Sequence, residues 1–226
     1  RYFNNSIRKS SFSNLGLKCM SLVTNTILKT YMPELAQGTG ADSELTALLN
    51  RVEVAIARYL GFPFIYDGAV YKNSLEVETY TLYYDGPSLG NSLMLDLRLK
   101  PVHSITSIHS DPYQEYGADT LIDSESYNLD NVKGEVRLKP KTAIDVFDKG
   151  DRAIKVVCTA GYTSASLPPE LEHAICVWAS QLQRNKQNQG RETVSQRGGA
   201  TNLSPKTMPL EVKEYLKPYR LSGTIL

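Results

Sequence analysis

The chain has 226 residues, 41% hydrophobic residues and a formal net charge of +1 at pH 7. This length and apolar content predict a stable core in one large domain or two small ones, and the near-neutral charge argues against a protein that binds polyanions over its whole surface. No stretch approaches the roughly 18 to 20 apolar residues that a membrane span needs, and the first residues lack the apolar block of a secretory signal.

Charge is unevenly distributed along the chain. Before Glu34 all charged residues are basic, between Asp67 and Asp151 acids outnumber bases, and after Gln183 bases dominate again. Such asymmetry is typical of subunits that associate through complementary surfaces, or of contact with a polyanion. Solvated faces without any partner would give the same pattern, so these interpretations stay open.

Cysteine and histidine show no arrangement that predicts a metal site. The three cysteines form no CxxC or Cys/His spacing, which favours reduced thiols buried as small apolar groups in a protein made in the cytoplasm. The pair His173 and Cys176 is interpreted as a surface imidazole beside a core thiol, because nothing nearby would orient a catalytic base. The residues in question are Cys19, Cys158, Cys176, His103, His109 and His173.

The amino-terminal part predicts a flexible basic arm followed by two helices. Residues 17–31 carry a modest helical pattern that Pro33 ends. Asp42 and Ser43 are cap candidates for a stronger helix from Leu45, whose apolar residues follow the 3.6-residue period until Gly61.

The middle of the chain predicts a series of antiparallel strands and turns. Short runs rich in β-branched and aromatic residues are separated by Gly, Pro, Asn and Asp. Leu75, Val77 and Thr79 alternate with polar neighbours, which predicts a strand with one solvated face, and residues 131–134 predict a hairpin turn. The predicted strands fall within residues 64–72, 75–86, 93–99, 105–111, 126–130, 134–140 and 153–162.

The carboxyl-terminal part predicts a helix, a long polar segment and a second helix. The first begins at Pro168 and Pro169 and places Leu171, Ile175, Trp178 and Leu182 on one face. From Arg184 to Ser204 the apolar signal almost vanishes, and a linker of that length is generally functional or disordered. The second helix covers roughly residues 209–216 and ends at Pro218.

These elements predict an α+β protein, a small bundle of about four helices with an inserted antiparallel β-rich module. The expected organisation is a basic arm (1–16), a helical body (17–63 and 165–220) with a flexible loop (187–204), the β-rich insertion (64–164) and a tail (221–226).

Motifs for catalysis or nucleotide binding are missing from the sequence. There is no GxSxG elbow, and Gly198-Gly199 lacks the strand and the Lys-Ser/Thr of a phosphate loop. The acids between Asp111 and Asp130 do not match a calcium loop. Tyrosines in the β region are interleaved mainly with acids, which favours a core or protein-binding role over base stacking. We therefore expect no catalytic, cofactor-binding or metal-binding residues.

Several segments together resemble the head-tail connector (adaptor) proteins of tailed bacteriophages. The helix ending in RVEVAIARYLGFPF is similar to the family's first conserved helix, and YYDGPSLGNSLMLDLRLKPVHSITSIHSD and SYNLDNVKGEVRL are similar to its strands and hairpin. LPPELEHAICVWASQLQRNKQNQG and MPLEVKEYLKPYR resemble its closing helices. The resemblance covers roughly residues 20 to 220 in the family's order, and that order carries it, because each motif alone is a short apolar pattern.

The resemblance implies a non-enzymatic virion protein of the phage neck, made in the host bacterial cytoplasm. Such proteins form a homo-oligomeric ring, commonly of twelve subunits, beneath the portal protein. The ring extends the channel through which DNA passes and docks the next neck or tail-completion protein. The basic arm, the large β insertion and Asn185-Lys186 in place of the helix-end Arg depart from the family pattern and leave the contacts of arm and insertion open.

Partner contacts are expected in the polar loop and at the chain's closing segment, where Tyr and Arg are typical interface anchors. The candidate residues for binding the portal or a neighbouring subunit are Arg191, Arg197, Gly198, Gly199, Lys206, Lys217, Tyr219 and Arg220. Two alternatives remain: a nucleic-acid-binding protein that uses the basic arm and loop, and an enzyme with dispersed catalytic residues.

Overall fold

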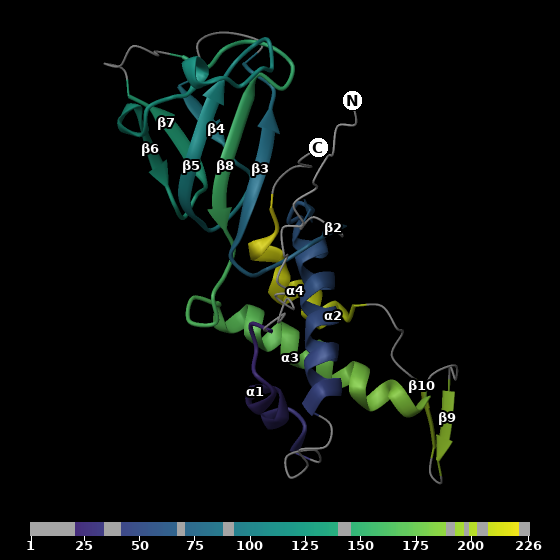
Figure 1. Cartoon of the computed structure of the whole chain (residues 1–226). Coiled ribbons are helices and arrows are strands. Elements are labelled where there is room, and N and C mark those ends of the chain that lie inside the picture. Colours follow the sequence, from purple (N-terminus) through teal and green to yellow (C-terminus); the bar gives the residue numbers. More distant parts are fainter. Residues whose placement is uncertain are drawn as a thin grey trace, which may run out of the picture.

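A computed structural model describes residues 21–33, 42–66, 71–87, 93–139, 146–188, 193–196, 199–202 and 208–221. The predicted basic arm, Cys19, residues 17–20 of the first predicted helix, and residues 222–226 of the tail lie outside these ranges. Four α-helices gather at one end of the described molecule and two three-stranded antiparallel sheets at the other (Figure 1). The predicted α+β fold class is confirmed. We call the four helices the helical body and the two sheets the β module.

Helix α2 (Asp42–Leu60) is the longest element of the helical body. Leu45, Leu49, Val52 and Ile56 are buried along one stripe, as the apolar period predicts. Asp42 and Ser43, expected to cap the helix, lie in its first turn instead, where the carboxylate of Asp42 pairs with Lys29 at 2.7 Å. At the other end Gly61 adopts φ +92° and the N–H of Phe62 reaches back to the carbonyl of Ala57 at 3.0 Å, an arrangement that ends the helix.

Helix α1 (Asn25–Thr30) is shorter than the sequence predicts, because residues 21–24 are not helical. Thr24 is the N-cap, and its hydroxyl accepts a hydrogen bond from the N–H of Ile27 at 3.3 Å. Ahead of the cap, Val23 directs its N–H to the carboxylate of Glu53 on α2. A helical turn at residues 21–24 would forfeit that tertiary bond.

Helices α3 (Pro169–Arg184) and α4 (Leu210–Leu216) complete the body and agree with the predicted bounds. Helix α3 follows Pro168 and buries Leu171, Ile175 and Trp178, while Leu182 is only half-buried. It contacts α1, α2 and α4, so it is the central element of the body. A short 3₁₀ turn, η5 (Lys217–Tyr219), follows α4 at Pro218. No helix in the described ranges is both long and apolar enough to cross a bilayer.

The β module consists of two antiparallel sheets that share one core. In the first sheet β8 (Ile154–Ala160) lies between β3 (Glu78–Tyr84) and β5 (Val102–Ser110). In the second β7 (Glu135–Leu138) lies between β4 (Met94–Asp96) and β6 (Tyr127–Asp130). Buried side chains from both sheets and from the helices belong to one continuous cluster.

Two local predictions in the β module have different outcomes. The turn at residues 131–134 joins β6 to β7 as predicted, with Asp130 paired to Glu135 and Gly134 at φ +70°. The solvated face predicted for this strand is present in β3, but Thr79 lies on it, whereas Tyr80 and Leu82 are buried. Leu75 is buried but precedes the strand, and Glu76 between them forms a bridge with Tyr162, so the alternation does not continue from Leu75 into β3.

The chain passes between helical body and β module twice, and the two passages lie side by side. The N–H of Tyr162 donates to the carbonyl of Leu75 at 2.7 Å, and Glu76 forms a parallel bridge with Tyr162. Gly161 adopts φ +123° between them, and a methyl group there would overlap the carbonyl oxygen of Glu76. We call residues 73–76 and 160–162 the junction.

Two small hairpins lie outside these sheets. Strands β1 (Ile65–Tyr66) and β2 (Tyr71–Lys72) pair after α2, within a predicted strand region. Strands β9 (Thr193–Gln196) and β10 (Gly199–Asn202) pair with each other in the segment predicted to be a polar loop. The hydrophobic pattern did not indicate β9 and β10 because, of their eight residues, Val194 and Ala200 alone are apolar.

Candidate interaction surfaces

The closing segment of the chain brings three parts of the helical body together. The N–H of Leu221 donates to the carbonyl of Leu60 at the end of α2, at 2.8 Å. The hydroxyl of Tyr219 donates to the Glu170 carboxylate at the start of α3. That hydrogen bond to a carboxylate disfavours the phenolate and raises the pKa of Tyr219 to about 12. Tyr219 is therefore engaged within its own subunit.

The neighbouring cations of this segment remain accessible. Arg220 is exposed and its guanidinium lies 5.6 Å from the ring centre of Tyr59, and Lys217 is exposed on the 3₁₀ turn. Of the eight predicted partner-binding residues, Lys217, Tyr219 and Arg220 thus share one surface. Gly199 opens β10 opposite Gln196, in another part of the fold. The remaining four, Arg191, Arg197, Gly198 and Lys206, lie outside the described residues.

An aromatic cluster joins α1, α3 and α4 beside this segment. The hydroxyl of Tyr31 lies 3.0 Å from Nδ1 of His173, and the rings of His173 and Tyr215 meet edge to face at 5.0 Å. One turn further along α3, Cys176 is buried, and this burial raises the pKa of its thiol to about 12. Its thiol is therefore protonated at neutral pH, as expected for a core cysteine. The cluster therefore packs the three helices against one another.

A partly open groove of about 450 Å³ lies between the amino-terminal two-thirds of α2 and the carboxyl-terminal half of α3. Its floor is apolar and its edges carry charged and polar side chains. At one end Lys186 pairs with Glu44 at 2.7 Å. The lining residues, which define the α2/α3 groove, are Glu44, Ala47, Leu48, Arg51, Val52, Ala55, Trp178, Leu182, Gln183 and Lys186.

Trp178 forms part of the wall of the α2/α3 groove. The side chain is 8% exposed, and its indole N–H has no hydrogen-bond acceptor in the described part of the chain. A buried donor without an acceptor costs stability. The sequence assigns Trp178 and Leu182 to a core-facing stripe, and the stripe alone cannot show that the two helices diverge enough to leave a hollow.

The outward side of α4 is another candidate surface. Leu210 is 74% exposed, and Glu211 and Glu214 are exposed beside it, whereas Val212 and Leu216 are buried on the opposite side. Leu210 and Glu214 are four residues apart and so lie on one helical stripe. We call Leu210, Glu211 and Glu214 the outer α4 face.

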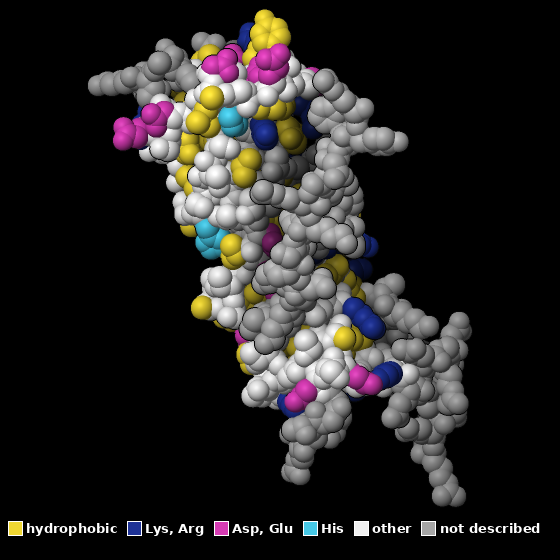
Figure 2. All heavy atoms as spheres, in the orientation of Figure 1, with side chains coloured by type: hydrophobic (Ala, Val, Ile, Leu, Met, Phe, Trp, Pro, Cys, Tyr) yellow, Lys and Arg dark blue, Asp and Glu magenta, His cyan; other side chains and the backbone are white. Residues whose placement is uncertain are grey.

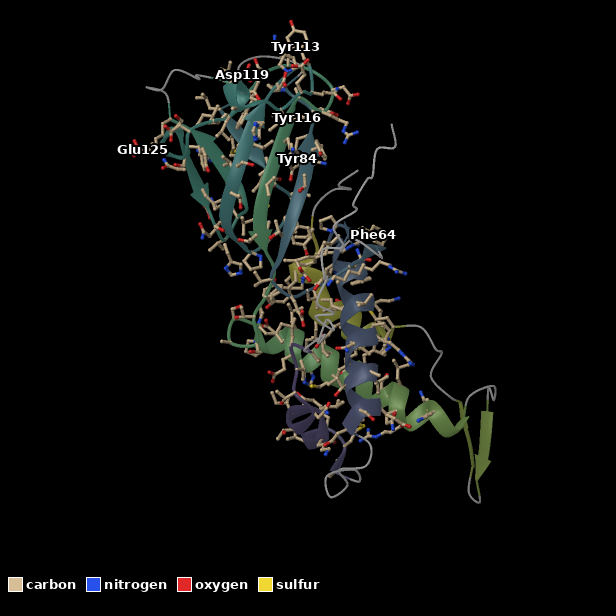
Figure 3. The ribbon with its side chains drawn as sticks, in the orientation of Figure 1. Phe64, Tyr84, Tyr113, Tyr116, Asp119 and Glu125 are labelled. Atoms are coloured by element: carbon tan, nitrogen blue, oxygen red, sulfur yellow. The ribbon has the colours of Figure 1, made fainter. Side chains whose placement is uncertain are left out.

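The far tip of the β module presents an exposed aromatic side chain on a well-supported loop. Tyr113 is 85% exposed and projects from this tip, with Asp119 nearby (Figure 3). The carboxylate of Asp111 accepts hydrogen bonds from the N–H groups of Tyr113, Glu115 and Tyr116 at 2.7–2.8 Å. Burial acts to raise the pKa of Asp111, but these bonds outweigh it and the pKa is lowered. Acidic side chains gather around this end of the molecule in Figure 2.

The predicted tyrosine-rich region therefore divides between core and surface. Tyr80 is buried in β3, and Tyr84 is half-buried with its hydroxyl on the carbonyl of Leu97 at 2.6 Å. Tyr113 is exposed, and Tyr116 is half-buried with its hydroxyl on the carbonyl of Arg152. Among the described residues, no three His, Cys, Asp or Glu side chains come together as a metal site would require.

These surfaces and the fold define an α+β protein with a helical body, a β module and several exposed faces. A chain from the neck of an empty gene transfer agent (GTA) particle, determined with C6 symmetry, has this fold: the TM-score is 0.50 at 16% identity, over 87% of the present chain and 90% of that chain. Two other solved structures give lower scores. One is a chain from the virion of a native GTA particle, with a TM-score of 0.49 and 19% identity over 87% of the present chain and 90% of that chain. The other is a chain from the neck of a native GTA particle determined with C12 symmetry, with a TM-score of 0.48 and 17% identity over 88% of the present chain and 91% of that chain.

At 16% identity, the likeness to the neck chain of the empty particle shows a shared fold alone. Comparison with protein-family models and with curated proteins gives no match.

Proposed function

We propose that this protein is a structural component of the neck of a phage-like particle, a head-tail adaptor without enzymatic activity. Subunits form a ring beneath the portal, extend the DNA channel and offer a docking surface to the next neck or tail protein. The observation that carries the proposal is the likeness to a GTA neck chain over 87% of this chain and 90% of that one. A match over nearly the whole length includes both the helical body and the β module.

Sixfold symmetry in that neck supports a closed assembly here. Closed rings of identical subunits use a heterologous contact, in which one surface of each copy meets a different surface of the next. We propose twelve copies, a number compatible with sixfold symmetry.

The proposed division of labour follows the two parts of the fold. Residues 17–63 and 165–220 form the ring-building body, and residues 64–164 form an inserted module. The junction supports this division because the chain leaves and re-enters the helical body at one place. Contacts with the portal or a neighbour are proposed for the loop 187–204, with Arg191, Arg197, Gly198 and Gly199, and for Lys206, Lys217, Tyr219 and Arg220.

Mass measurement and electron microscopy of the purified full chain, alone and mixed with its cognate portal, test the proposal. We expect closed rings that bind the portal end-on and leave a central channel. A chain that stays monomeric and does not bind the portal would contradict the proposal. Tight, strongly salt-dependent binding of the free chain to DNA would instead favour the nucleic-acid-binding alternative.

A further inference from the structure

The α2/α3 groove is lined by apolar side chains from both helices, with charged and polar side chains among them. The α2 side chains that line it recur at spacings of three and four residues, so they form one continuous wall along that helix. Trp178 and Leu182 form the facing wall on α3. A hollow of about 450 Å³ between two packed helices can receive side chains without a rearrangement of the backbone.

The edge of the groove has an excess of positive charge. Arg51 is exposed there, and in the described part of the chain no carboxylate pairs with it. Lys186 is also exposed and pairs with Glu44 at 2.7 Å. An occupant that combines an apolar side chain with carboxylates would fit both the floor and the edge.

The outer α4 face has this complementary combination. Leu210 is an apolar side chain that is 74% exposed, and Glu211 and Glu214 are exposed beside it. A large exposed aliphatic residue between two acids suits an apolar hollow with a basic edge.

The two surfaces lie at different ends of α3. Helix α4 and the turn after it contact α3 near its start, through Tyr215 on His173 and Tyr219 on Glu170. The groove uses the second half of α3, from Trp178 to Lys186. A subunit can therefore use its α4 face and its groove at the same time, with two different neighbours.

We propose that the occupant of the α2/α3 groove is the outer α4 face of a second copy of this chain. Leu210 enters the hollow, and Glu211 and Glu214 meet Arg51 and Lys186 of the neighbour. The contact is heterologous, so each added copy leaves one groove and one α4 face free for the next. This inference rests on the proposed ring and names the surfaces that build it.

Directed disulfide formation tests the contact. In a Cys19→Ser background, Arg51→Cys protein is mixed with Glu214→Cys protein under mild oxidation. Cys158 and Cys176 are buried and do not compete. We expect mixed disulfide dimers at about tenfold the level obtained when Arg51→Cys protein is mixed with Glu125→Cys protein, because contact raises the local thiol concentration. Glu125 is a matched control, an exposed glutamate on the β module (Figure 3).

Charge exchange and fluorescence give independent readouts. Arg51→Glu should abolish self-association, and adding Glu214→Arg to the same chain should restore it. Trp178 is the chain's one tryptophan, so its emission reports on the groove. We expect emission to shift as the protein concentration rises, and Leu210→Ser, at an exposed position, to remove the shift without changing the thermal midpoint.

The outcomes separate this inference from the proposed function. Rings that form without the Arg51–Glu214 cross-link, or with unchanged yield in Leu210→Ser, overturn the inference and leave the adaptor proposal standing. Cross-linked open filaments support the contact and contradict the closed ring. A protein that neither cross-links nor assembles contradicts both.

Discussion

Glu53 illustrates how a single ionisable group contributes to the fold. Its carboxylate is buried on α2, where it accepts hydrogen bonds from the hydroxyl of Ser21 at 2.6 Å and from the N–H of Val23 at 3.2 Å. Burial raises the pKa from its ordinary value of 4.5 to about 7, although these two bonds oppose the shift. Glu53 thereby holds the segment before α1 against α2, while its burial makes ionisation unfavourable in the folded protein.

Replacing Glu53 with Gln should flatten the dependence of stability on pH. The folded protein keeps the Glu53 proton up to about pH 7, whereas the unfolded chain releases it near pH 4.5. Protonated Glu53 therefore contributes fully to the stability of the fold below pH 4.5. This contribution declines as the pH rises and is lost above about pH 7. Gln keeps an acceptor for both bonds and does not ionise, so at pH 8 the variant should be more stable by up to about 3 kcal/mol.

Urea unfolding of both proteins at pH 5, 6.5 and 8 measures this difference. Glu125→Gln, at an exposed position, is the control and should follow the wild type at each pH. Burial also raises the pKa of Glu76, and the charge of Glu76 contributes to the raised pKa of Glu53. Parallel stability curves for wild type and Glu53→Gln would show that Glu53 does not titrate as its burial requires.

Among the structural elements, the junction depends on Gly161. The residue has φ +123° and lies against the backbone of residues 75 and 76, so a side chain meets both conformational strain and a steric overlap. The junction also includes Asn73, whose buried amide donates to the carbonyl of Phe62 at 2.7 Å. These contacts fix the β module to the end of α2.

Gly161→Ala should destabilise the protein more than Gly150→Ala. Gly150 also has a positive φ, of +143°, but an added methyl group there meets its nearest neighbour at an ordinary 3.5 Å. For Gly161→Ala we expect a loss of about 3 kcal/mol in the free energy of unfolding, because the methyl group meets both backbone strain and steric overlap. For Gly150→Ala we expect a loss of about 1 kcal/mol, because backbone strain acts there without overlap. Chemical denaturation of the two variants tests this order. Equal losses would mean that the close approach at Gly161 relaxes without cost.

Elements with a strong local signal could be predicted from the sequence. Helix α2 follows its apolar period, and α3 and α4 follow their prolines and apolar stripes. The turn before β7 contains Gly134, which the positive φ there favours. In contrast, α1 begins where tertiary bonding to Glu53 ends, and the phase of β3 is set by the junction. Neither is encoded in local periodicity.

The candidate site was less predictable because it depends on how elements meet. Tyr219 and Arg220 could be singled out by residue type, but their contacts with Glu170 and Tyr59 join residues far apart in the chain. Trp178 and Arg51 lie on stripes that look like ordinary core and surface positions. They line one groove because α2 and α3 diverge there, and only the packed structure shows this.

At the scale of the whole molecule, the parts differ in how they could meet partners. The helical body carries the α2/α3 groove and the outer α4 face, and the β module presents Tyr113 among acids at its far tip. The β9–β10 hairpin extends beyond α3, and its strands pair with each other rather than with either sheet (Figure 1). Such a hairpin can contact a partner with little effect on the body.

Deleting residues 193–202 should separate assembly from folding. Because β9 and β10 pair with each other, we expect the thermal midpoint to stay within about 2 °C of the wild type. Portal binding, measured by co-sedimentation, should fall about tenfold or more if the loop contributes an interface hot spot. Val132→Ser, in the exposed turn before β7, is the control. Undiminished portal binding by the deletion variant would remove the loop from the proposed interface.

The junction also has a consequence for the order of folding. Helices α2 and α3 are separated by about a hundred residues, so bringing them together directly would close a long loop and fold slowly. Once β3 and β8 pair and Tyr162 bonds to Leu75, that loop is effectively reduced to residues 61–72 and 163–168 on either side of the junction. The β module would then act as an intramolecular scaffold, and amides of β8 should gain protection from hydrogen exchange before those of α3.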